Sequence, residues 1–437
     1  MYSIWSREAD MPQFPPLEGD TRTDVLIIGG GIAGVLCAHC LRQAGLDCLL
    51  LEAETVGCGV TLGTTAKITA QHGLMAGPLI RTLGQDRARL FVRANLDAVE
   101  DYRRLCAGLD CDLEAADSYV YSRDDRELIQ REVDDLHRLG CPASFHQDVE
   151  LPFPVAGAAK VPDQLQFHPL KFLGAIARRL NIREHTPVRA VGDLIRGERA
   201  VSTSRGIVRA KRVIVATHFP FLDRFGGYFV KLYQDRSYVV ALEYAPQLAG
   251  MYRDADEKGL SLRSAGPYLL LGGNGGRRTG KPSQGWRPLL ETAHRYWPDA
   301  KTAAFWATQD CMTLDGVPYV GLYGKNTEGL YVTTGFQKWG MTGSMVAAQI
   351  LTAMLTGREH PAQAVCSPQR TVPLPALAAN GMEAAADFAF PTLRRCPHLG
   401  CALRWNKAER TWDCPCHGSR FTRDGRLLDG PAQEGLD

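Results

Sequence analysis

The sequence lacks an excess of charge of either sign. It has 50 Lys and Arg against 48 Asp and Glu, so the net charge is +2 at pH 7 with His neutral. Binding to nucleic acid by bulk electrostatics needs a basic excess, so no nucleic-acid partner is expected.

The sequence also lacks a long uninterrupted apolar run. The first twenty residues show no basic flank followed by an apolar stretch, so we expect no secretory signal. The longest weakly charged stretch, 25–41, is broken by three consecutive glycines, which favours a buried strand, a tight turn and a helix over a membrane span. We therefore expect a cytoplasmic protein with no membrane partner.

What the chain does have is length and cysteine. Its 437 residues exceed one ordinary core, and 45% hydrophobic and 22% charged residues are typical of a soluble globular protein, so two or three domains are expected. The thirteen cysteines are an odd number and are scattered, which argues against a disulfide framework throughout the chain in a reducing compartment.

The stretch DVLIIGGGIAG, residues 24–34, predicts a dinucleotide site. An apolar strand leads into G-x-G-x-x-G at Gly29, Gly31 and Gly34, a helix follows, and a second strand ends in Glu52. Gly29 permits the tight turn, Gly31 lets a pyrophosphate approach the helix N-terminus, and Gly34 lets helix and strand pack closely. A carboxylate at Glu52 can bind a ribose diol.

Three later segments indicate a long cofactor held by a discontinuous domain. They are a small-residue stretch (57–73), a strand with a small-residue loop (211–221), and a strand, glycine loop and helix (329–355). On residues alone, FAD and NAD both stay open.

These segments resemble the D-amino-acid-oxidase-like flavoproteins, the group of glycine and sarcosine-type amine oxidases, over about residues 20–370. The resemblance rests on LIIGGGIAG, TTAKITAQHGL and TLDGVPYVGL…LYVTTGFQKWGMT, and it implies FAD. It places Glu52 on the adenosine ribose and Val188 beside the adenine. It places Thr64, Thr65, Ala66 and Lys67 along the flavin, and Gly335, Trp339, Gly340, Met341 and Thr342 by the isoalloxazine ring. The expected cofactor-binding set also contains Ile32, Ala33, Ala53, Ala216 and Thr217.

The expected fold is α/β: a Rossmann-type FAD-binding domain, a sheet-based α+β substrate domain, and a small all-β tail. The flavoprotein would span 1–370, with FAD-binding parts at about 20–80, 160–232 and 322–370. The substrate domain would take about 81–159 and 233–321. A linker at 371–390 would precede a module at 391–437.

The tail contains a second motif, in which each short box mixes Cys with His. Cys396-x-His398 is followed after fifteen residues by Cys414-x-x-His417. Such a mixture suits a [2Fe–2S] cluster with one iron on two thiolates and the other on two imidazoles. A structural zinc site, or no metal, are the alternatives.

The stretch CPHLGCALRWNKAERTWDCPCHGSRF resembles the disulfide-bearing Rieske [2Fe–2S] motif. The resemblance implies a disulfide between the remaining cysteines, Cys401 and Cys416. Ser419 keeps one hydrogen-bond donor to sulfur, whereas Phe421 stands where high-potential relatives have Tyr, which predicts an intermediate reduction potential. Only 25 residues separate the end of the flavoprotein pattern near Arg370 from Cys396, so this module is expected to lean on the flavoprotein, either its own or that of a neighbour in a homo-oligomer.

The two motifs together predict an FAD-dependent oxidoreductase that takes a hydride from a small amine or amino-acid-like substrate. Electrons would pass singly to the cluster and on to an unknown acceptor. The alternatives are an O₂-using oxidase with a vestigial tail, and a redox sensor.

The substrate and the catalytic residues are less defined. Where the family's amino-acid oxidases have a carboxylate-binding Arg, five residues before the Asp of Asp315-Gly316, this chain has Asp310. A carboxylate there favours an amine without a nearby carboxylate, unless Asp310 pairs with an arginine such as Arg263. His72 and His168 are further catalytic candidates, and core packing is the alternative for each.

Overall fold

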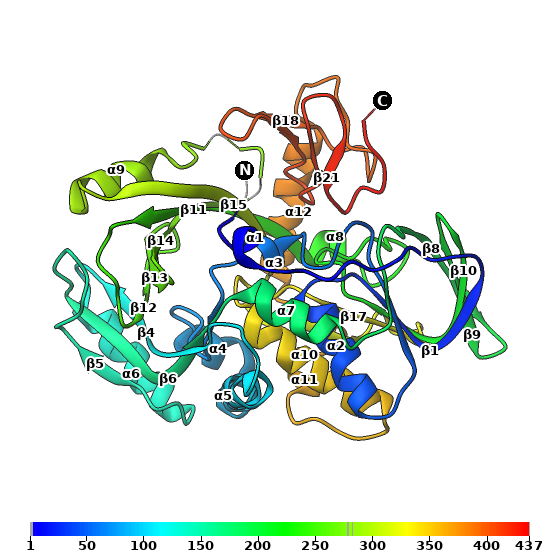
Figure 1. Ribbon diagram of the computed structural model, residues 1–437, viewed down its shortest axis with the longest axis horizontal. Helices are drawn as coiled ribbons and strands as arrows, with labels where there is room; N and C mark the ends of the chain where they lie inside the picture. The colour runs from blue at the N-terminus through cyan, green and yellow to red at the C-terminus, as the bar shows by residue number, and fades with distance from the viewer. Residues whose placement is uncertain (1–2, 278, 282, 437) are drawn as a thin grey trace.

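The computed structural model describes residues 3–277, 279–281 and 283–436. Two large sheets and one small sheet organise the chain, as expected for an α/β flavoprotein with an all-β tail (Figure 1). Among the described residues, no helix is long and apolar enough to cross a membrane.

The first sheet has eight strands and a parallel centre. Strands β7, β2, β1, β10 and β17 run parallel, β16 is antiparallel at one edge, and β9 and β8 extend β10 as a meander. Its strands are β1 (Thr21–Ile28), β2 (Cys48–Leu51), β7 (Ile182–Arg183), β8 (Val188–Ile195), β9 (Glu198–Thr203), β10 (Gly206–Val215), β16 (Tyr319–Leu322) and β17 (Leu330–Thr334). The centre is buried because β1 is apolar on both faces, as parallel strands covered by helices are.

Helices from distant parts of the chain cover this sheet. Helix α2 (Ile32–Gln43), which follows β1, packs on α10 (Gly340–Leu355), which follows β17. The remaining helices of the flavoprotein part are α1 (Trp5–Glu8), α3 (Val60–Gly63), α4 (Ala76–Leu83), α5 (Gln85–Cys106), α6 (Arg126–Arg138), α7 (Pro169–Ala177), α8 (Tyr228–Lys231), α9 (Arg287–Tyr296) and α11 (Gln363–Cys366). The pairing of α2 with α10 brings both glycine-rich helix starts into one region.

The second sheet has nine strands and is mostly antiparallel. Its order is β15, β11, β14, β13, β12, β4, β6, β3, with β5 beside β6. The strands are β3 (Lys67–Ile68), β4 (Glu114–Ser122), β5 (Ser144–His146), β6 (Gly157–Gln166), β11 (Leu232–Glu243), β12 (Met251–Asp254), β13 (Ser261–Ala265), β14 (Tyr268–Arg277) and β15 (Lys301–Thr313). The long pair β11–β15 forms one edge, and the domain boundaries given above stay predictions.

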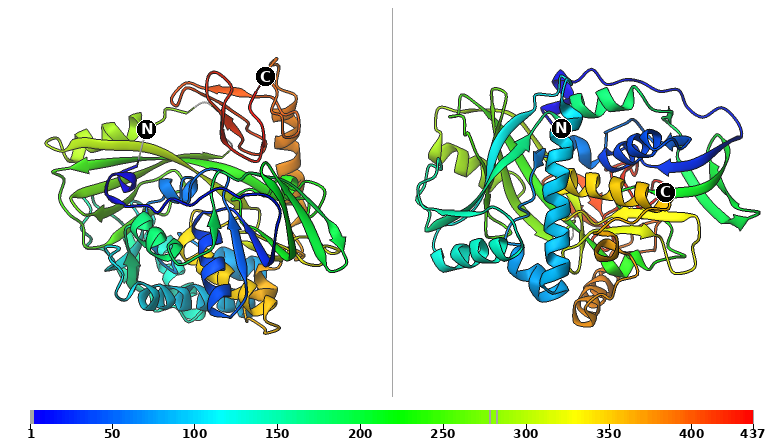
Figure 2. Two further views of the ribbon diagram at one scale, coloured as in Figure 1. Left: turned by 45° about the vertical axis from the view of Figure 1, so that its right-hand side comes forward. Right: turned by 90° about the horizontal axis from the view of Figure 1, so that it is seen from below.

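The C-terminal segment forms a small antiparallel sheet of β18 (Arg404–Asn406), β19 (Thr411–Asp413), β20 (Arg420–Phe421) and β21 (Leu427–Asp429). It lies over β11 and β15, and the left view of Figure 2 shows it beside the flavoprotein part. The segment 371–390, expected as a linker with at most one helical turn, instead contains the fifteen-residue helix α12 (Leu374–Phe388). Its six alanines favour the helix, and Pro375 is tolerated in the first turn.

Candidate functional site

One large cavity of about 1180 Å³ extends from the start of α2, past the β11–β15 edge of the second sheet, to the C-terminal segment. This volume is larger than a small metabolite alone would need. The two ends of the cavity differ chemically. Glycine-rich backbone forms one end, and charged side chains of β11 and β15 form the other.

The first end has the geometry expected for a dinucleotide. Gly29 adopts φ +111°, and a Cβ there would lie 2.6 Å from the carbonyl oxygen of Ala216. A Cβ on Gly34 would lie 1.9 Å from the oxygen of Gly29, so close packing of α2 on β1 requires both glycines. Gly31 begins α2 at the cavity wall, where helix N–H groups face an incoming anion.

Glu52 lies directly after β2 and lines the cavity. Its carboxylate accepts hydrogen bonds from the backbone N–H of Gly30 at 2.6 Å and of Glu54 at 2.9 Å. Burial raises the pKa of Glu52, while these N–H donors oppose the shift. The carboxylate is therefore held in place at the cavity surface, as a ribose-binding residue must be.

Most of the predicted cofactor-binding residues meet in this cavity. Those that line it are Gly29, Gly31, Ile32, Ala33, Glu52, Ala53, Thr64, Thr65, Lys67, Val188, Ala216, Thr217, Trp339, Gly340 and Met341. Four of the predicted residues do not line the cavity: Gly34, Ala66, Gly335 and Thr342. Segments separated by more than three hundred positions, from Gly29 to Met341, thus line one cavity, and this donor set fits FAD.

The C-terminal segment lines the same cavity, which the sequence did not predict. Residues 426–435 form part of the wall, and Arg189, next to Val188, donates a hydrogen bond to the carbonyl oxygen of Gln433 at 2.8 Å. The end of the chain therefore lies over the nucleotide-binding part of the cavity.

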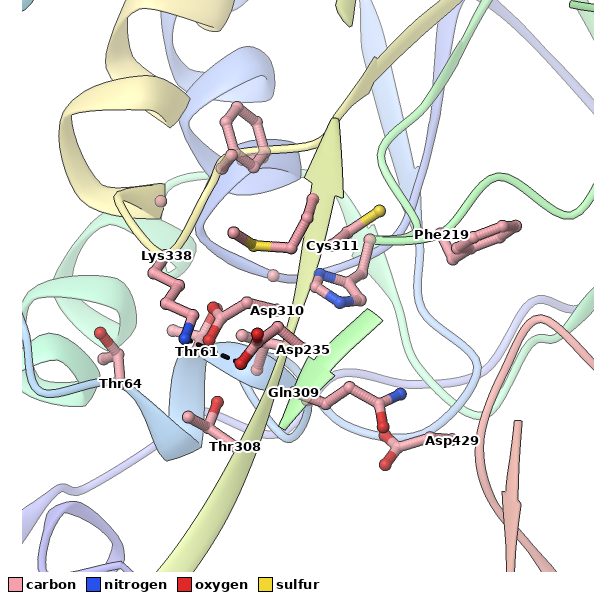
Figure 3. Close-up of a pocket in the computed structure, with 18 of the residues that line it drawn as sticks. Thr61, Thr64, Phe219, Asp235, Thr308, Gln309, Asp310, Cys311, Lys338 and Asp429 are labelled. Carbon is pink, nitrogen blue, oxygen red and sulfur yellow. Dashed lines mark hydrogen bonds and ion pairs between the residues drawn. The ribbon is translucent and has the colours of Figure 1, made fainter. Parts of the chain in front are cut away.

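At the charged end, two carboxylates stand opposite each other on neighbouring strands. Asp235 of β11 is the cross-strand partner of Asp310 of β15. Lys338 reaches Asp235 Oδ1 with its Nζ at 2.8 Å, and Figure 3 shows these three side chains together on one side of the pocket. The carboxylate of Asp310 forms no hydrogen bond or ion pair with any residue that the structure describes.

The electrostatics of this end leave a negative charge uncompensated. Burial raises the pKa of Asp310 to about 6; Lys338 and Arg236 oppose the shift, and Asp235 adds to it. Near pH 7, two carboxylates therefore face one lysine. The alternative pairing with Arg263 is wrong, because that guanidinium donates to the backbone oxygens of Ala66 and Ser264 instead.

The two histidine candidates have different positions. His72 lines the cavity, stacks on Trp339 with ring centroids 5.1 Å apart, and contacts Thr69 and Thr342 through Nε2. Burial lowers its pKa to about 3, so the imidazole is neutral and orients its neighbours. His168 does not line the cavity: it caps α7 by accepting the N–H of Lys171, which supports the packing alternative for this residue.

The C-terminal module brings the predicted cluster ligands together. Cys396 and Cys414 belong to one buried cluster of side chains, and the rings of His398 and His417 lie 5.0 Å apart. Both ring nitrogens of His398 are buried and neither has a hydrogen-bond partner among the described residues, as expected for a side chain that ligates a metal. Two thiols and two imidazoles at one place fit a Rieske-type [2Fe–2S] cluster.

The predicted Cys401–Cys416 disulfide is not found. None of the thirteen cysteines forms a disulfide, and the sulfur atoms of Cys401, Cys414 and Cys416 lie within 4.8 Å of one another. The two loops do face each other, as the resemblance implied, but the sulfurs are not bonded.

The module is seated on the β11–β15 pair. Gln309 donates a hydrogen bond from Nε2 to the carbonyl oxygen of Gly418 at 2.8 Å, and it also lines the cavity. Arg236 forms a buried ion pair with Glu409 and is not among the cavity-lining residues. The seat of the module and the wall of the cavity therefore share Gln309.

A buried ionic network strengthens this seat. Arg420 binds Glu409 at 2.7 Å and Asp413 at 3.1 Å, and Thr279 donates to Asp413 at 2.8 Å. Burial alone would raise the pKa of Glu409, but Arg420 and Arg236 together lower it below its usual value. The expectation that a shortened module leans on the flavoprotein is met within one chain.

Phe421 permits a direct test of the predicted intermediate potential. Its side chain is fully buried in the module core, and Ser419 contacts Cys396. Phe421→Tyr should raise the midpoint potential of the cluster, because a hydroxyl donor near sulfur stabilises the reduced, more negative state. An EPR-monitored redox titration measures the shift, and a potential that stays the same or falls would refute the hydrogen-bond account.

Comparison with known proteins agrees with both halves of the site. Residues 24–354 match the model of the DAO family, FAD dependent oxidoreductase, and residues 389–437 match the Rieske [2Fe-2S] domain. YhfW of Bacillus subtilis (strain 168), named as a Rieske 2Fe-2S iron-sulfur protein, is 33% identical over 98% of this chain and 96% of its own length.

Solved structures share the flavoprotein fold. Glycine oxidase from Geobacillus kaustophilus has a TM-score of 0.67 at 20% identity, covering 80% of this chain and 100% of its own. L-amino acid deaminase from Proteus vulgaris has a TM-score of 0.68 at 14% identity, covering 83% and 100%. At these identities the likeness shows the fold alone.

Proposed function

Because the chain belongs to the DAO family of FAD-dependent oxidoreductases and carries a Rieske [2Fe–2S] domain, we propose that it oxidises a small amine and passes the electrons to the cluster. From the cluster they leave singly to an external acceptor. When bound, FAD supplies a hydride acceptor that can hand on electrons one at a time.

The charged end of the cavity supports an amine. Asp310 stands where a carboxylate-binding arginine would select an amino acid, and it has no partner among the described residues. Lys338 is already engaged by Asp235. The remaining carboxylate favours a cationic amine and opposes a substrate carboxylate at this position, because like charges in a partly buried site repel strongly.

One observation supports the electron route, the contact of the cluster loop with the cavity wall. Gln309 lines the cavity and donates a hydrogen bond to the carbonyl oxygen of Gly418, the residue after His417. The cavity and the cluster loop therefore meet at this side chain. Such closeness favours transfer within one chain.

An anaerobic substrate panel tests this proposal. Primary and secondary amines are compared with amino acids of the same carbon skeleton, with flavin absorbance and the EPR signal of the reduced cluster recorded together. We expect amines to bleach the flavin and then produce the EPR signal. Bleaching only by amino acids would refute the substrate class, and bleaching without any EPR signal would refute the route.

A further inference from the structure

The two histidines of the cluster site meet different surroundings. His417 faces the rings of Phe219, at 5.8 Å, and Phe229, at 6.4 Å between centroids. His398 faces a carboxylate: its Nε2 lies 2.9 Å from Oδ2 of Asp223. Asp223 belongs to the flavoprotein part, in the segment between β10 and α8, so an acidic residue from outside the module reaches a predicted cluster ligand.

The carboxylate distinguishes the two ring nitrogens of His398. Neither nitrogen forms a hydrogen bond with a described residue, but Nε2 lies beside the carboxylate of Asp223, which leaves Nδ1 as the nitrogen open to iron. With iron on Nδ1, the ring keeps its proton on Nε2, and this N–H faces the carboxylate. A carboxylate at the outer nitrogen fixes the tautomer and the ring orientation and makes the histidine a more basic ligand.

The contact is largely shielded from water. The side chain of His398 is only 5% exposed and that of Asp223 is 30% exposed. Charges in such a setting interact more strongly than at an open surface. The nearest neighbour of opposite charge along the chain, Arg224, is directed to Asp193 at 3.3 Å.

We propose that Asp223 is a positioning residue that lowers the reduction potential of the cluster. A more basic ligand stabilises the oxidised iron, and a nearby negative charge opposes the arrival of an electron; both effects have the same sign. This inference needs the cluster and its docking, and it holds whatever the substrate is.

Docking of the module on the flavoprotein part therefore helps to set the reduction potential of the cluster. Phe421 lacks the hydroxyl that would raise the potential from inside the module, and Asp223 lowers it from outside. The cluster therefore has its working potential only when the module is seated on its own flavoprotein part.

The test is Asp223→Asn, which keeps the size of the side chain and removes its charge. We expect an EPR-monitored redox titration of the full-length protein at fixed pH to give a higher midpoint potential than the parent. The matched control is Asp193→Asn, which removes the exposed carboxylate that pairs with Arg224, the residue after Asp223, and should leave the potential unchanged. Iron content of two per chain confirms that each variant holds the cluster.

An unchanged or lower potential in a fully loaded Asp223→Asn protein overturns the proposal. Should that variant lose iron, Asp223→Glu decides, since it keeps the charge at the same place. A loaded Glu variant with a potential close to or below the parent supports the role of the charge, and a clearly higher potential contradicts it. None of these measurements uses an amine, so they stay distinct from the test of the proposed function.

Discussion

The Cys414→Ser variant should still be bleached by substrate but should no longer reduce a one-electron acceptor. Cys414 is fully buried in the module and is one of the two predicted thiolate ligands, so its replacement leaves the cluster site incomplete. The loss of acceptor reduction should be no smaller than the ~10–100-fold that removal of an outer-shell partner costs a metal site. Stopped-flow absorbance at the flavin band measures reduction of the flavin by substrate. Steady-state acceptor reduction measures the transfer of electrons out of the protein.

The matched control is Cys366→Ser, because Cys366 is equally buried but lies in α11, in the flavoprotein part. Flavin content must stay at one per chain in both variants. A Cys414→Ser protein that passes electrons as fast as the parent would show that the cluster is not the exit, and dioxygen or another direct acceptor would become the better answer.

Asp310→Asn should raise the apparent KM for a cationic amine while leaving flavin content intact. A hydrogen bond to a charged group contributes about 1.5–3 kcal/mol, so the expected rise is about 10- to 100-fold. Steady-state kinetics with the amine found in the substrate panel measures the rise. Glu243→Gln, a carboxylate at the far end of β11, is the control and should leave the KM unchanged.

The pH dependence of the parent supplies a second check on Asp310. Its pKa is raised to about 6, chiefly by burial, so the carboxylate is charged above that pH and neutral below it. The KM for an amine that stays protonated throughout should therefore rise as pH falls through about 6. In the Asn variant this rise should be absent, and its persistence would assign the titration to another group.

The parts of the site that could be predicted from sequence are those whose partners are close along the chain. The dinucleotide turn at Gly29–Gly34 and the acid at Glu52 belong to one βαβ unit, and the cysteines and histidines of the tail lie in two short boxes. Local spacing fixes such geometry before any tertiary contact forms.

The residues that sequence reasoning missed owe their positions to long-range pairing. Asp235 faces Asp310 only because β11 pairs with β15 in that register. Arg236 meets Glu409, and Asp223 meets His398, across more than 170 positions. No spacing signal could have found these pairs, because a slip of one residue would turn every side chain of a strand to the opposite face.

Helix α12 illustrates a different failure. The sequence analysis predicted a linker with at most one helical turn for this segment, although Pro375 is compatible with the first turn of a helix. The helix forms nevertheless, since alanine has the highest helix propensity and Asn380 anchors the helix by donating to the carbonyl oxygen of Val230.

Because the module docks on the flavoprotein part, folding and cluster insertion should follow a fixed order during biosynthesis. Residues 404–429 are synthesised after β11 and β15, so Arg236, which pairs with Glu409, has already left the ribosome by then. The four short strands of the module bury little apolar surface of their own, so they gain stability only on a finished β11–β15 edge. Iron and sulfide should therefore be inserted after the flavoprotein has folded, and cells short of iron should accumulate chains that carry flavin and await a cluster.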